Sequence, residues 1–239
     1  NPCEIDRLTF FAKSNNIKLI FDSAGAIGSS YKDKLIGNYG DAEVFSFHAT
    51  KLLPVGEGGA VIFKDEESER YARKMIDFGF NGNRSSDILG LNGKVTEISA
   101  AIGLKSLEKL ERAVIKRNKI VERYKDIFYD LKHRGLVRFQ EIENFSRSSY
   151  QILNIVTKDR EIKSQISYIL QKNDIITREY FNPPCHKQPY LQSDDYLPNT
   201  EVISNNSISL PIWDTMKDKH LLYIEKYLKI YNSLLLGLY

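Results

Sequence analysis

The stretch "AEVFSFHATKLLPVGEGGAVIFK", residues 42–64, contains two apolar runs separated by a turn rich in glycine. The runs 42–48 and 59–64 have the β-branched and aromatic composition of buried strands. Between them lies Lys51, with His48 as the other basic side chain of the turn. A lysine between a buried strand and a sharp turn is a candidate nucleophile, because partial burial favours its neutral form.

The segments around this stretch predict an α/β domain. Apolar positions at helical spacing predict a helix over residues 4–15, and the short run 17–21 predicts a parallel strand that ends at Asp22. A helix with an acidic first turn is expected over residues 65–79. In such domains ligands gather at the carboxyl ends of strands, which is where we expect Asp22.

The second half of the chain has a different pattern. Helical periodicity from Val95 to Lys132 predicts two helices with a break near Glu111. The proline-rich stretch 181–200 is expected to be irregular. Further strands are expected over residues 135–140, 150–157 and 208–213, and further helices over 160–173 and 216–235. Strands and helices in separate clusters indicate a smaller α+β domain.

Composition excludes several classes of protein. The 239 residues carry a net charge of +3 that is spread along the chain, which favours neither nucleic acid nor a membrane surface as a partner. No apolar run approaches the roughly 18 residues that a membrane helix needs. Cys3 and Cys185 lie far apart without metal-ligand spacing, so we expect no metal site and a reducing, cytoplasmic compartment.

Three side chains near the central turn match the needs of one cofactor. Pyridoxal phosphate requires a lysine for a Schiff base, a carboxylate at its pyridine nitrogen and donors for its phosphate. Lys51, Asp22 and Ser46 are of these types, and Asp22 and Ser46 lie at expected strand ends. The residue types alone leave open whether the three converge, because lysines are also common on protein surfaces.

Longer motifs carry a family resemblance. They are "FDSAGAIGSSYKDKLIGNYGDAEVFSFHATKLLPVGEGGAVI" (21–62), "LGLNGKVTEISAAIGLKSLEKLE" (89–111), "PPCHKQPYL" (183–191), "LPNTEVIS" (197–204) and "SLPIW" (209–213). In this order they resemble the DegT/DnrJ/StrS family of pyridoxal-phosphate-dependent sugar-nucleotide aminotransferases. The resemblance implies an α/β, aspartate-aminotransferase-like fold (fold type I) with a mostly parallel sheet. Residues 1–115 would then be the C-terminal portion of the large cofactor-binding domain, and residues 116–239 a small C-terminal α+β domain.

The resemblance also implies roles for single residues around the cofactor. Lys51 would form the Schiff base and later move the proton, and Asp22 would pair with the pyridinium nitrogen. Ser46 would bind the cofactor phosphate, and Ala24 would belong to the same cofactor site. Asn92, in "LGLNGK", would reach the phosphate of the neighbouring subunit's cofactor. The implied assembly is a homodimer with a shared active site.

The expected substrate follows from the same resemblance. The family transfers an amino group, with glutamate as the donor, to a nucleotide-linked keto-deoxysugar for surface polysaccharide biosynthesis. The "SFHATK" and "DFGF" motifs favour branches that aminate C4 of a dTDP-sugar. Arg178, Tyr180 and His186, in and before the proline-rich stretch, are the substrate-binding candidates. For each of them an ordinary surface role is the alternative.

Two departures from the family pattern keep other functions open. Family members carry Gln or His three residues after the aspartate, where this chain has Gly25. They also have a segment upstream of "NPCEIDRL" with a phosphate cradle and a ring-stacking aromatic residue. A truncated, inactive remnant that acts as a binding or regulatory module is therefore one alternative. A sugar dehydratase with the same cofactor is another, but in that branch a histidine replaces the lysine.

Overall fold

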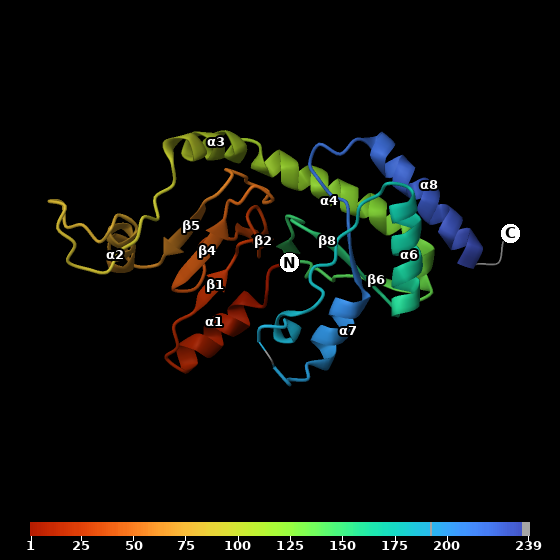
Figure 1. Ribbon diagram of the computed structural model, residues 1–239, viewed down its shortest axis with the longest axis horizontal. Coiled ribbons are helices and arrows are strands. Elements are labelled where there is room, and N and C mark those ends of the chain that lie inside the picture. Colours follow the sequence, from red (N-terminus) through yellow and green to blue (C-terminus); the bar gives the residue numbers. More distant parts are fainter. Residues whose placement is uncertain (192, 236–239) are drawn as a thin grey trace. The chain divides into compact units, whose positions relative to one another are not determined.

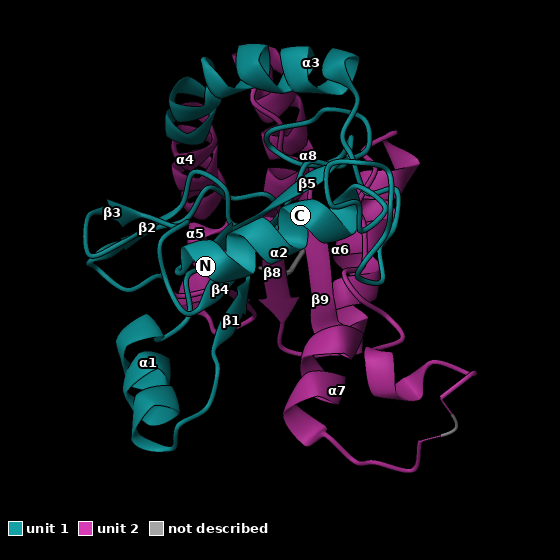
Figure 2. Ribbon diagram, turned by 90° about the vertical axis from the view of Figure 1, so that its left-hand side faces the viewer, with its two compact units in different colours: residues 1–115, 142–151 teal, residues 116–141, 152–239 magenta. Residues whose placement is uncertain are grey.

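The computed structural model describes residues 1–191 and 193–235, and it divides into two compact units (Figure 2). Unit 1 comprises residues 1–115 and 142–151, and unit 2 comprises residues 116–141 and 152–239. A single cut at residue 115 does not describe this division. Residues 142–151 return to unit 1 because β7 (Ser146–Arg147) pairs with β2 (Ser30–Tyr31) there.

The main sheet of unit 1 has the strand order β1-β4-β5, with α1 beside it (Figure 1). Its strands are β1 (Ile20–Asp22), β4 (Ala42–Ser46) and β5 (Gly59–Phe63), and they confirm the three strands expected in this region. β4 runs parallel to β1 and antiparallel to β5. The link from β1 to β4 includes a small sheet, whereas β4 and β5 are joined by a turn too short for a crossover.

Four helices follow the sequence expectation in unit 1. They are α1 (Ile5–Ser14), α2 (Glu66–Ile76), α3 (Glu97–Leu107) and α4 (Leu110–Ile127), the last of which continues into unit 2. The Asp65 carboxylate caps α2 by accepting a hydrogen bond from Ser68 N at 2.8 Å. The expected break near Glu111 lies two residues earlier, between α3 and α4.

The sequence did not predict the second sheet of unit 1. It consists of β2, β3 (Lys34–Leu35) and β7, and its strands have only two residues each. Tyr31 anchors it by packing with Ile5 and Phe21 in a buried cluster, and its ring meets the Phe145 ring edge-on at 5.3 Å. Arg147 adds a bidentate pair to Glu111, with nitrogen–oxygen distances of 2.6 and 2.9 Å. Strands this short give no periodicity that a sequence could reveal.

Unit 2 has an antiparallel sheet of order β6-β8-β9, which confirms the strands expected here. Its elements are β6 (Val137–Phe139), β8 (Leu153–Thr157), β9 (Ser207–Leu210), α5 (Tyr129–His133), α6 (Arg160–Lys172), α7 (Pro198–Asn206), α8 (Asp218–Leu235) and the 3-10 turn η1 (Cys185–Lys187). Tyr124, Phe128 and Ile155 are fully buried in this unit. The expectation of an irregular stretch up to residue 200 is wrong at its end, because Pro198 begins α7.

None of the described helices combines the length and the apolar character that a membrane crossing requires.

The Arg147–Glu111 pair predicts an acid sensitivity of unit 1. Hydrogen bonds from Arg147 hold the pKa of Glu111 below its ordinary value of 4.5. The pair therefore stabilises the fold above pH 4.5, and this contribution is lost as the pH falls further. Arg147→Ala should lower the free energy of unfolding by about 1 kcal/mol at pH 7 and by less at pH 3, measured with urea.

A matched control is Arg73→Ala, which removes an exposed pair with Glu69 on α2. It should change the free energy of unfolding by less than about 0.5 kcal/mol. Equal effects of the two substitutions, or an Arg147 effect that does not shrink in acid, would contradict the prediction.

Candidate functional site

Asp22 is the last residue of β1, as the sequence predicts. Its Oδ1 accepts a hydrogen bond from Ala24 N at 3.0 Å, so the backbone after the strand orients the carboxylate. The side chain is exposed, and within the described residues Asp22 takes part in no ion pair. One carboxylate oxygen thus has a backbone donor, and the other remains available for a ligand.

Ser46 ends β4 and lies on the same face of the sheet as Asp22. Asp22 is in register with Val44, and a strand returns to the same face after two residues, at Ser46. Ser46 Oγ accepts a hydrogen bond from His48 N at 3.3 Å. Because this bond uses a lone pair of the hydroxyl, its own proton is left to donate to a further acceptor.

Lys51 lies in a turn whose backbone is fixed on both sides. Its N–H donates to the His48 carbonyl at 2.9 Å, and Val55 N donates to the Phe47 carbonyl at 2.9 Å. The following Leu52 packs in a buried cluster with Ala113 and Val114. The Lys51 side chain is partly buried, and among the described residues no carboxylate pairs with its ammonium group. The turn therefore fixes the lysine backbone, while the side-chain nitrogen has no carboxylate partner among the described residues.

His48 and Gln151 hold the residues before Lys51. His48 Nδ1 lies 2.9 Å from Thr50 Oγ1, and its Nε2 lies 3.5 Å from a Glu57 carboxylate oxygen. Gln151 Nε2 donates to the Thr50 carbonyl at 2.6 Å. Sequence analysis missed Gln151, because a contact between residues about one hundred positions apart leaves no local signal.

The glycines of the turn act in two different ways. Gly56 has a positive φ of 91°, a conformation that favours glycine, whereas Gly58 and Gly59 do not. Gly59 is needed for space, because a Cβ there would lie 2.6 Å from the Phe45 carbonyl oxygen. β5 can therefore approach β4 closely at the point where Ser46 ends the strand.

Gly25 lies in open space beside the same turn. A Cβ at this position would meet only Gln151 Cγ, at the ordinary contact distance of 3.9 Å. The absence of a side chain is thus not imposed by crowding. Gln151 borders this space with a polar side chain where relatives, by the resemblance, carry Gln or His at the glycine itself.

Asn92 lies in an exposed segment that follows α2. Leu91 N donates to the Met75 carbonyl at 2.8 Å and Gly93 N to the Ile76 carbonyl at 2.9 Å, so the segment is fixed on both sides of Asn92. The Asn92 side chain is exposed, as a contact with a ligand or another subunit would require.

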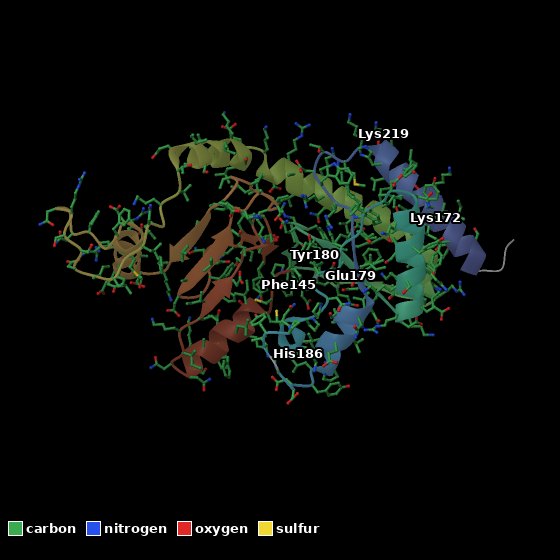
Figure 3. All side chains as sticks on the ribbon, in the orientation of Figure 1. Phe145, Lys172, Glu179, Tyr180, His186 and Lys219 are labelled. Atoms are coloured by element: carbon green, nitrogen blue, oxygen red, sulfur yellow. The ribbon has the colours of Figure 1, made fainter. Side chains whose placement is uncertain are left out.

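The three substrate-binding candidates belong to unit 2, and Figure 3 labels two of them, Tyr180 and His186. Arg178 pairs through its backbone with Ser209, and its side chain is exposed. His186 is not a solvated loop residue: its side chain is only 10% exposed, and its Nε2 lies 3.2 Å from a Glu201 carboxylate oxygen. This contact lowers the pKa of Glu201.

A cavity in unit 1 lies apart from this site. It has a volume of about 460 Å³ and is lined by Leu19, Gly40 and Asp41, which precede β1 and β4. It therefore lies at the amino ends of these strands, away from Asp22 and Ser46. In the part of the chain that the structure describes, no group of three or more His, Cys, Asp or Glu side chains could hold a metal ion.

The α/β unit thus has a carboxylate and a hydroxyl at strand carboxyl ends and a lysine on the next turn, which is the arrangement expected of a cofactor-binding domain of the aspartate-aminotransferase-like class. The family model of the DegT/DnrJ/EryC1/StrS aminotransferases matches residues 1–229. The chain belongs to this family, which confirms the expected family and fold.

Known proteins show how far this likeness extends. The chain is 38% identical over 208 residues to Protein Rv3402c of Mycobacterium tuberculosis, a match that covers 84% of this chain and 49% of that protein. It is 30% identical over 227 residues to GDP-perosamine synthase of Escherichia coli O157:H7, covering 94% of this chain and 61% of the synthase. The chain thus spans about half to three fifths of the length of these relatives.

The fold of the chain also matches a solved structure. DesI, determined in the presence of its TDP-sugar product, matches with a TM-score of 0.84 and 30% identity over 96% of this chain and 59% of DesI.

The cofactor of this family is pyridoxal phosphate, and the residues present fit it in three respects. Asp22 has a second carboxylate oxygen that could meet the ring nitrogen, Ser46 has a hydroxyl proton that could bond to the phosphate, and Lys51 has no carboxylate partner among the described residues.

Proposed function

We propose that this chain forms part of an aminotransferase that uses pyridoxal phosphate to transfer an amino group from glutamate to a nucleotide-linked keto-deoxysugar. The observation that carries the proposal is the placement of Asp22 and Ser46 on one face of paired strands, followed by the unpaired Lys51. We further propose C4 of a dTDP-sugar as the position, a cytoplasmic location and a role in surface polysaccharide biosynthesis. The likeness to DesI supports the nucleotide, and two free cysteines suit a reducing compartment.

Bound pyridoxal phosphate supplies an aldehyde that condenses with amines and a ring that accepts an electron pair. Lys51 would hold the cofactor through its Nζ, and the same nitrogen, when free, would accept a proton from the substrate and return one to it. Asp22 would pair with the ring nitrogen and favour its protonated form. Ser46 would donate a hydrogen bond from its hydroxyl to the phosphate, and Ala24 N–H orients the Asp22 carboxylate.

The partner in this proposal is a second copy of the chain. α3 has no buried residue, and its apolar side chains are exposed, with Ile98 at 76% and Leu104 at 67%. Exposed apolar side chains in this number favour a protein partner. Asn92, shortly before α3, would then reach the partner's cofactor phosphate.

Substrate recognition is proposed for unit 2. Arg178 can bind a diphosphate through two guanidinium nitrogens, and Tyr180 is 37% exposed, so part of it is accessible to a base or a sugar. His186 is already bound to Glu201, so its role would be to support the loop or to donate a hydrogen bond when protonated.

The lysine assignment has a spectroscopic test. In the whole protein, added pyridoxal phosphate should produce the visible band of a lysine-linked cofactor, and Lys51→Ala should abolish it. His48, the other basic residue beside this turn, provides the control, because His48→Gln should retain the band. A band that persists in Lys51→Ala would refute the assignment.

The substrate assignment has a product test. With glutamate as donor, a dTDP-linked 4-keto-6-deoxysugar should give 2-oxoglutarate and the 4-amino sugar, measured by mass spectrometry. The GDP-linked analogue should react at least about tenfold more slowly, because its base and sugar contacts differ. Turnover of the GDP-linked compound alone would contradict the dTDP proposal, and a deoxygenated product would indicate a dehydratase.

The shared active site has a complementation test. Lys51→Ala and Asn92→Asp should each be inactive, the second because a carboxylate repels the phosphate. Co-expressed and mixed, the two chains should recover about a quarter of wild-type activity, because half of the dimers contain one intact site of two. No recovery, despite mixed dimers detected by two affinity tags, would place Asn92 in its own subunit's site.

A further inference from the structure

Unit 1 contains a buried carboxylate that is hydrogen-bonded to Ser23, the residue after Asp22. Glu43, the second residue of β4, is only 1% exposed. Ser23 Oγ donates to its Oε1 at 2.5 Å, and Tyr39 N donates to its Oε2 at 3.2 Å. Each oxygen thus has one donor, and among the described residues no cation pairs with Glu43. Burying a carboxylate is costly, so its presence here calls for a function.

The Glu43 carboxylate binds the side chain of Ser23, the residue that follows Asp22. Ser23 is 6% exposed, and its backbone is used on both sides: its N–H donates to the Val44 carbonyl, and its carbonyl accepts from Ala26 N, both at 2.9 Å. Together with the side-chain bond to Glu43, these contacts fix the peptide that joins Ser23 to Ala24. That peptide carries the N–H that donates to Asp22 Oδ1.

We propose that Glu43 is a positioning residue for the cofactor: through Ser23 it sets the direction of the Asp22 carboxylate. The inference rests on the proposed role of Asp22 as the partner of the ring nitrogen. Glu43 lies on the neighbouring strand and would act without touching the cofactor. A purely structural residue at this position of β4 could be apolar, like its neighbours Ala42 and Val44, at lower cost in desolvation.

A second carboxylate of the same strand pair gives a matched control. Asp41 accepts from Leu19 N at 2.9 Å and pairs with Lys18 at 3.1 Å, so it also joins the segments of β1 and β4. It does so at the amino ends of these strands, away from Asp22. The Asp41→Asn variant therefore shows how much cofactor binding changes when only the link between β1 and β4 is weakened.

The experiment measures the dissociation constant of pyridoxal phosphate for the whole protein, by equilibrium dialysis. Ser23→Ala removes only the hydrogen bond of the hydroxyl and should raise the dissociation constant about tenfold. Glu43→Gln should also raise it. Asp41→Asn should leave it within about twofold. In an Asp22→Asn background, Ser23→Ala should have no further effect, because the two residues act through one interaction.

A spectroscopic measurement separates positioning from stability. Ser23→Ala should move the pH midpoint of the visible band of the lysine-linked cofactor upward, as Asp22→Asn does. Without a well-aligned carboxylate the ring nitrogen loses its proton, and the imine then holds its own proton more strongly. Asp41→Asn should leave this midpoint unchanged.

The outcomes distinguish the inference from the proposed function. If Asp22→Asn weakens binding but Ser23→Ala does not, or if the two effects simply add, the role of Glu43 is refuted and the function stands. If Asp22→Asn changes neither binding nor the spectrum, both are refuted. Ser23→Ala keeps the test decisive even where Glu43→Gln fails to fold.

Discussion

The site depends on the parallel pairing of β1 with β4. The register that sets Asp22 beside Val44 also determines that Ser46 lies on the same face of the sheet, two residues further along. A slip of one residue would turn Ser46 to the opposite face and separate the carboxylate from the hydroxyl. Two buried contacts, Phe21 in its apolar cluster and Glu43 with Ser23, resist such a slip.

The turn after β4 determines where Lys51 lies relative to Asp22 and Ser46. β5 returns antiparallel along β4, and the two strands approach so closely at position 59 that a side chain there would collide with the Phe45 carbonyl. The turn in between cannot extend freely, because Leu52 and Val55 are buried and Thr50 is held by Gln151. The lysine is therefore placed by contacts on both sides of it, including one from the distant segment 142–151 that β7 brings back to unit 1.

Sequence predicted those parts of the structure whose cause is local. The strands around Lys51 and the amphipathic helices have periodicities that a short window reveals, and Asp22 follows an apolar run. β2, β3 and β7 have two residues each, and α7 begins within a proline-rich stretch, so their windows carry no such signal. The sequence also could not show which of the three turn glycines has a positive φ, because this depends on the backbone geometry of the folded turn.

Polar contacts distant in sequence were the least predictable part of the site, and they separate supporting groups from reacting ones. Glu43, Gln151 and His186 each have a partner within the chain, with Glu43 and His186 largely buried. A carboxylate or imidazole already bound in this way can orient its neighbours but has little capacity left for a ligand. Asp22, Ser46 and Lys51 show the opposite property in the described structure, since each is fixed mainly through backbone contacts. A cofactor site requires groups of this kind, because the ligand must meet side chains that are oriented by the backbone and still have a donor or acceptor available.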